Sequence, residues 1–141
     1  MTDSPEAIYR SMVEAFNEGA AAGWSIGQVI CRQVGELAQY AAVAYMPDGS
    51  KTYLDGVGMA FGDSFDALRE LFAQPGKGTW FTATIKFTSD GRLSGDFDYD
   101  NEPEWGLKVS PGHYVEEWEL YPRDAAHTPD WLAARLAEAA K

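Results

Sequence analysis

Apolar and polar residues alternate most regularly in residues 79–88, TWFTATIKFT. In an extended chain, one side of this segment carries the apolar residues Phe81, Ala83, Ile85 and Phe87. A period of two is typical of a strand that buries one face. The Ser-Asp-Gly that follows is suited to a turn, and the returning segment has an apolar side formed by Leu93, Gly95, Phe97 and Tyr99. The pattern therefore predicts an antiparallel hairpin.

Residues 24–34 and 37–46 are rich in Val, Ile, Tyr and Trp and have the length of strands. Gly35-Glu36 between them is suited to a tight turn. PDGS at 47–50 predicts another turn, because proline supplies the fixed φ of its second position and glycine tolerates a positive φ. The next residues, 51–57, are predicted to form the returning strand.

Helices are predicted before, within and after this run of strands. Ser4-Pro5 predicts the start of a first helix, because serine is a good N-cap and proline fits the first turn. A middle helix is predicted to begin at residues 63–64 and to end at 73–78, AQPGKG. Two further helix starts are the Ser-Pro and Thr-Pro pairs at 110–111 and 128–129.

The order of these elements predicts an α+β fold. We expect an antiparallel β-sheet of about five strands flanked by an N-terminal helix, a middle helix and two C-terminal helices. A hydrophobic fraction of 45% in 141 residues supports one packed core, and thus a single domain over residues 1–141.

The composition narrows the classes of function. A formal net charge of −11 opposes binding to nucleic acids and anionic membranes, whose affinity for proteins depends on Lys and Arg. Cys31 is the only cysteine, which excludes an internal disulfide and a multi-cysteine metal site. The start MTDSPEAIYR lacks the apolar segment of a signal peptide, and no apolar run approaches the ~20 residues that span a bilayer. We expect a cytoplasmic protein.

Negative charge is concentrated in one part of the chain. Residues 90–119 hold nine acidic and two basic residues, a net charge of −7 out of −11. Within this window, a carboxylate occupies every second position over nine residues: Asp96, Asp98, Asp100, Glu102 and Glu104. These five residues are called the acidic stretch below and are the candidate functional site.

Metal binding and catalysis are two interpretations of the acidic stretch. Its spacing matches the opening of a calcium-binding EF-hand loop, but Asn101 occupies the position of the required glycine and Leu107 that of the required glutamate. Paired carboxylates also serve glycoside hydrolysis, which needs a pocket and one carboxyl group with a raised pKa. The sequence indicates neither of these. We therefore expect no enzymatic activity, no cofactor and no dedicated metal site.

A surface that binds a basic partner is the favoured hypothesis. Like charges on one strand face repel, and a merely solvated face gains nothing from them. Trp105 and Trp118 are candidate anchors, because tryptophan is enriched at binding hot spots. Structural roles stay open as alternatives: Asp98 and Asp100 are equally suited to stabilising a turn, and each tryptophan to the core.

Two segments resemble the YezG-like immunity proteins, a family once of unknown function: GRLSGDFDYDNEPEW and YVEEWELYP. The shared features are a strand that ends in an FDYD-type motif, here residues 97–100, and a helix with a Trp-x-x-Tyr element and a proline. In this chain the helical element is Trp118 with Tyr121, followed by Pro122. The specific part of the resemblance covers residues 79–123. The Ala- and Gly-rich composition and the LAARLAEAAK end differ from Lys- and Glu-rich members.

The resemblance implies a non-enzymatic, cytoplasmic antitoxin of a bacterium. Such proteins bind the toxic C-terminal domain of a secreted polymorphic toxin, often a nuclease exported by a type VII-like secretion system, and protect the producing cell. A nuclease needs a basic cleft for phosphates, which an acidic protein complements. The alternatives are a small acidic metal- or ligand-binding module and a general protein-interaction adaptor.

Overall fold

The structure, a computed structural model, describes residues 4–141. It has the expected α+β architecture, in which five antiparallel strands form one sheet in the order β3-β2-β1-β4-β5. The strands are β1 (Ile26–Val34), β2 (Leu37–Tyr45), β3 (Lys51–Tyr53), β4 (Thr82–Thr88) and β5 (Leu93–Asp98). The helices are α1 (Pro5–Gly19), α2 (Val57–Phe72), α3 (Gly112–Leu120) and α4 (Asp130–Ala139), with a short 3-10 turn η1 (Ala125–His127) before α4.

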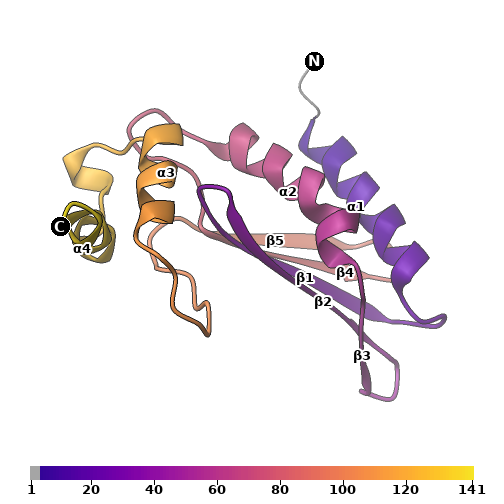
Figure 1. Cartoon of the computed structure of the whole chain (residues 1–141). Coiled ribbons are helices and arrows are strands. Elements are labelled where there is room, and N and C mark those ends of the chain that lie inside the picture. Colours follow the sequence, from indigo (N-terminus) through magenta and orange to yellow (C-terminus); the bar gives the residue numbers. More distant parts are fainter. Residues whose placement is uncertain (1–3) are drawn as a thin grey trace.

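Two layers and one end region make up the molecule (Figure 1). Helices α1 and α2 lie along one face of the sheet, whereas α3 and α4 lie at one end of it. A first core fills the space between the sheet and the helices α1 and α2. A second, smaller core lies under α3 and α4 and consists of Val34, Phe81, Trp105, Tyr114 and Leu132.

Local signals in the sequence account for several elements. The Ser4 hydroxyl accepts a hydrogen bond from the backbone N–H of Ala7 at 3.2 Å and so caps α1. The turn between β1 and β2 depends on Gly35, whose φ of 60° favours glycine. In β4 the alternation is confirmed, because Ala83, Ile85 and Phe87 are buried and the residues between them are more exposed.

The predicted boundary between the third strand and the middle helix is wrong. Strand β3 ends at Tyr53, and α2 begins at Val57 and not at residues 63–64. Gly56, with a φ of 65°, lets the chain turn into the helix, which then buries Val57 and Phe61. Glycines at 58 and 62 are unusual in a helix, so the start of α2 is not apparent in the sequence. Because they have no side chain, α2 can lie close to the Tyr40 ring.

The apolar side predicted for the return strand is only partly correct. Phe97 and Tyr99 pack against the first core, but Leu93 and Gly95 are exposed. The register pairs Asp96 with Thr84 and Asp98 with Thr82. Thr82 and Thr84 alternate with the residues of β4 that are buried in the first core against α1 and α2. Both aspartates therefore lie on the opposite face of the sheet.

Candidate partner-binding surface

The acidic stretch does not continue as one row of carboxylates, because β5 ends at Asp98. The Asp98 carboxylate accepts hydrogen bonds from the backbone N–H groups of Asp100 at 2.9 Å and Asn101 at 3.0 Å. Such a turn is a common role of aspartate. Burial opposes ionisation of Asp98, but these hydrogen bonds outweigh it and lower its pKa. The turn-stabilising role considered for Asp98 is therefore confirmed.

Four carboxylates of the acidic stretch line two different cavities. Asp98, Glu102 and Glu104 line a cavity of about 280 Å³, together with Arg32 and Thr82. Asp100 lines a separate cavity of about 260 Å³ with the basic residues Lys77, Arg123 and His127. The structure thus brings three of the five acidic residues together and separates Asp100 from them.

Glu102 is held by residues far away in the sequence. Its carboxylate accepts a hydrogen bond from the Tyr114 hydroxyl at 2.7 Å. Arg135 of α4 donates from Nε at 2.9 Å and from a terminal nitrogen at 3.1 Å, a two-point ion pair. These contacts fix the loop of the acidic stretch to α3 and α4, so Glu102 is a structural residue in this conformation.

Trp105 and Trp118 lie in or against the second core. The Trp105 ring is only 8% exposed, and its Nε1–H donates to the Tyr114 hydroxyl at 3.1 Å. Trp118 is half-buried and packs on the same cluster. Trp118 is therefore partly exposed to solvent, whereas Trp105 contributes to the core.

Three carboxylates of the stretch remain available for a partner: those of Asp96, Asp100 and Glu104. Each of these residues is exposed. Within residues 4–141, no hydrogen bond or ion pair involves their side chains. The Asp100 carbonyl, in contrast, accepts a hydrogen bond from Trp131 Nε1 at 2.7 Å, which holds the backbone of the turn against α4.

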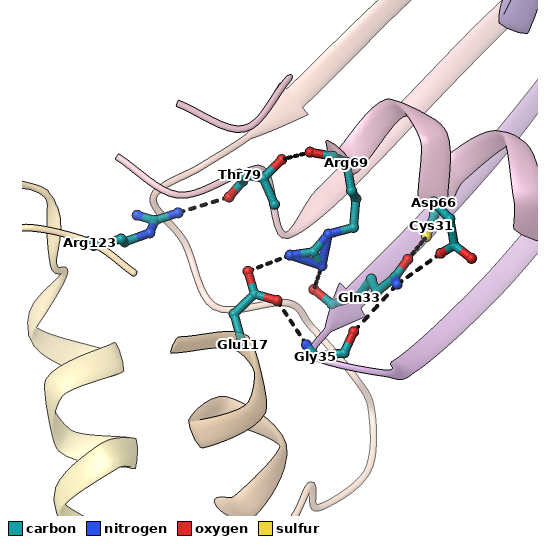
Figure 2. Close-up of polar contacts among 8 residues, drawn as sticks. All are labelled: Cys31, Gln33, Gly35, Asp66, Arg69, Thr79, Glu117 and Arg123. Atoms are coloured by element: carbon teal, nitrogen blue, oxygen red, sulfur yellow. Dashed lines mark hydrogen bonds and ion pairs between the residues drawn. The ribbon is translucent and has the colours of Figure 1, made fainter. Parts of the chain in front are cut away.

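A buried polar network next to this region escaped the sequence analysis (Figure 2). Arg69 of α2 forms an ion pair with Glu117 of α3, and both side chains are almost completely buried. Arg69 also donates to the Gln33 carbonyl at 3.1 Å, while Glu117 accepts from the Gly35 N–H at 2.8 Å. The network ties α3 to α2 and to the β1–β2 turn. A signal existed in the sequence, because both charged residues fall on apolar helix stripes.

Thr79 and Arg123 extend the network. The Thr79 hydroxyl donates to the Arg69 carbonyl at 2.7 Å, and Arg123 donates to the Thr79 carbonyl at 2.9 Å. The guanidinium of Arg123 lies 4.5 Å from the centre of the Phe81 ring. The segment after α3 is therefore fixed to the residues that precede β4. The end region that carries the acidic stretch is thus held in a defined position and is called the platform below.

The carboxylates do not converge as metal ligands would. Among the described residues, no group of three or more His, Cys, Asp or Glu side chains is arranged to hold a metal ion. The oxygens of Asp98 and Glu102 already accept hydrogen bonds from backbone and side-chain groups. The arrangement fits charge-based recognition of a surface better than coordination of one ion.

The contribution of Glu102 to stability is expected to depend on pH. Burial opposes its ionisation, but hydrogen bonds from Arg135 and Tyr114 outweigh it and lower the pKa from 4.5. A lowered pKa stabilises the fold above the unfolded-state value, and this stabilisation is lost as the pH falls through the folded-state value. Glu102→Gln should therefore lower the free energy of unfolding by about 1 kcal/mol at pH 7 and by much less at pH 3. The effect at pH 7 is limited because the carboxylate is partly exposed to solvent.

Urea unfolding of both proteins at pH 7 and pH 3 measures this difference. Glu104→Gln is the matched control, because its exposed carboxylate has no partner within residues 4–141. A Glu102→Gln cost that stays constant between the two pH values would contradict the assignment.

In the part of the chain that the structure describes, no helix combines the length and the apolar character needed to cross a bilayer. Compared with known protein families, the chain matches no family model, and no curated protein is significantly similar to it. The resemblance of residues 79–123 to YezG-like proteins stays a hypothesis.

Proposed function

We propose that this protein is a non-enzymatic immunity protein that binds and neutralises a basic toxin domain, such as a secreted nuclease. The observation that carries the proposal is the set of exposed carboxylates without partners, those of Asp96, Asp100 and Glu104. They lie on a platform whose backbone is fixed by the contacts of Asp98, Glu102 and Trp131. The resemblance of residues 79–123 to immunity proteins supports the same function.

Charge and rigidity favour tight binding for separate reasons. Unpaired surface carboxylates accelerate the encounter with a basic partner, because complementary potentials steer diffusion. A platform that is already ordered loses little conformational entropy on binding, so more of the contact energy remains as affinity. A nuclease cleft, which must be basic to bind phosphates, is a suitable target for such a surface.

Co-expression tests the proposal. Cells that produce the toxin domain encoded beside this protein should survive when the protein is present and die when it is absent. The toxin domain should co-purify with the protein, and the complex should weaken as salt is added. Equal killing with and without the protein, for each neighbouring candidate, would sink the proposal.

Charge-reversal variants test whether the acidic stretch contacts the toxin domain. Asp96→Lys combined with Glu104→Lys should slow association with the toxin domain by at least about 10-fold at low salt, because steering charges act on the association rate. Glu14→Lys with Glu18→Lys on α1 makes the same change in net charge at two exposed positions elsewhere. Stopped-flow or surface-plasmon measurements compare the two pairs. Equal rates for both would exclude the acidic stretch from the interface.

A further inference from the structure

A third cavity, away from the acidic stretch, has a negative lining of its own. Its volume is about 320 Å³, and it lies between α2, the β1–β2 turn, β2 and the end of α3. Three carboxylates line it: Glu36 from the turn, and Asp66 and Glu70 from α2. All three residues are exposed at the rim, where a partner can reach them.

The buried network forms the inner wall of this cavity and compensates its only basic residue. Arg69 is the single Lys, Arg or His of the lining, and its charge is paired with Glu117. The guanidinium also lies between aromatic rings, 5.5 Å from the centre of Trp80 and 5.3 Å from that of Tyr121. With Arg69 neutralised by Glu117, the three rim carboxylates leave the cavity strongly negative.

One of these carboxylates is held in place. Gln33, which is buried, donates from Nε2 to Asp66 at 3.1 Å, as Figure 2 shows. The Gln33 amide in turn accepts from the Cys31 thiol at 3.7 Å. Asp66 therefore presents its remaining oxygen from a defined position, whereas a carboxylate on a free surface would move.

Two half-buried tyrosines, Tyr40 and Tyr121, complete the walls. Burial raises the pKa of Tyr40 to about 12, with Asp66 among the further causes. Burial raises the pKa of Tyr121 as well. The charge of Arg69 opposes this rise, and the charges of Glu117, Glu70 and Asp66 add to it. Both hydroxyls stay neutral at pH 7, and the Tyr40 ring lies close to the negative charges of Asp66 and Asp63. Aromatic rings beside carboxylates are a favourable environment for an organic cation.

We propose that this cavity binds an arginine side chain of the partner protein. The carboxylates are too dispersed for a metal ion, since no three acidic or histidine side chains of the described residues are arranged to hold one. A guanidinium suits them better, because it is planar, carries five N–H donors and stacks on aromatic faces. The inference rests on the proposed function in one respect, namely that the partner is basic.

The test uses N-acetyl-arginine amide as a probe, with no toxin present. Titration to millimolar concentration, followed by ¹H–¹⁵N NMR, should shift the backbone amides of Gly35, Glu36 and Tyr121 in a saturable way. N-acetyl-citrulline amide has nearly the same shape without the charge and should leave them unchanged. Shifts that do not saturate, that citrulline reproduces, or that occur only around the acidic stretch would overturn the inference.

Variants localise the effect. Asp66→Asn with Glu70→Gln should weaken binding of the probe at least 10-fold, and Glu36→Gln alone should weaken it about threefold, because each removes a charge from the rim. Glu14→Gln with Glu18→Gln on α1 is the matched control and should leave the affinity unchanged. The same spectra report whether each variant is folded. Because Glu36 lies in an exposed turn, its variant keeps the test valid if the α2 pair unfolds.

The outcome is independent of the co-expression experiment. If the probe does not bind but cells are protected, the arginine cavity is excluded and the immunity function stands. If the probe binds but no toxin is neutralised, the affinity of the cavity for arginine stands, and the toxin domain is excluded as its source.

Discussion

Replacing Glu117 by alanine is expected to destabilise the protein by about 3–5 kcal/mol, because a buried charge would lose its partner. Arg69 is 2% exposed, and Glu117 is its only carboxylate partner within residues 4–141. The same substitution leaves the Gly35 N–H without an acceptor in the interior. Because the free energy of unfolding of a domain is only about 5–15 kcal/mol, such a loss is a large part of it.

Urea unfolding, followed by far-UV circular dichroism, gives the free energy of unfolding. Glu119→Ala is the matched control, since this exposed glutamate of α3 should change stability by less than about 0.5 kcal/mol. Arg69→Met combined with Glu117→Leu should recover at least half of the loss, because no buried charge remains. A cost below about 1 kcal/mol for Glu117→Ala would mean that Arg69 finds another partner or reaches water.

Short-range patterns explain why most of the fold was predictable. The alternation in β4, the capping serine of α1 and the glycine turn after β1 are each decided within a few residues of sequence. The start of α2 was not predictable in this way. Glycines at 58 and 62 lower helix propensity, and only the packing of α2 over Tyr40 explains their presence.

The concentration of carboxylates in the acidic stretch was predictable from the sequence, but the contacts of each of these residues were not. Charge density points to residues 96–104, and Asp96 and Asp98 do project from the outer face of the sheet. The structural role of Glu102 depends on its contacts with Arg135, which is 33 residues away, and with Tyr114. The pairing of Arg69 with Glu117 spans 48 residues. The apolar stripes indicate that Arg69 and Glu117 face the core, but they do not indicate which residues meet there, so these roles required the structure.

The second core fixes the position of the loop that carries the second half of the acidic stretch, which the charge pattern does not indicate. Trp105 follows directly after Glu104, so the burial of its side chain anchors the end of the loop in the second core. Tyr114 then connects the two halves of the arrangement, because it donates to Glu102 and accepts from Trp105. The exposed carboxylates of Asp100 and Glu104 are thus presented by a loop closed at both ends, at the Asp98 turn and at Trp105, whereas Asp96 lies in β5.

This arrangement predicts that Trp105→Ala costs about 3–5 kcal/mol of stability, the range for loss of a large aromatic side chain from a core. The change would open a cavity among Val34, Phe81 and Leu132 and remove the hydrogen bond to Tyr114. Urea unfolding measures the loss, and Leu107→Ala serves as the control. Leu107 is 62% exposed in the same loop and should matter by less than about 0.5 kcal/mol.

Trp105→Phe separates the two contributions of the indole. It keeps most of the apolar volume but leaves Tyr114 without the N–H donor, so we expect a loss of about 1–2 kcal/mol. Protection of cells by each variant decides between the core role and the anchor role. In the core role, Trp105→Phe retains protection and Trp105→Ala loses it together with its stability. A Trp105→Ala protein that unfolds at the same urea concentration as the wild type, yet no longer binds the toxin domain, would instead make Trp105 an anchor.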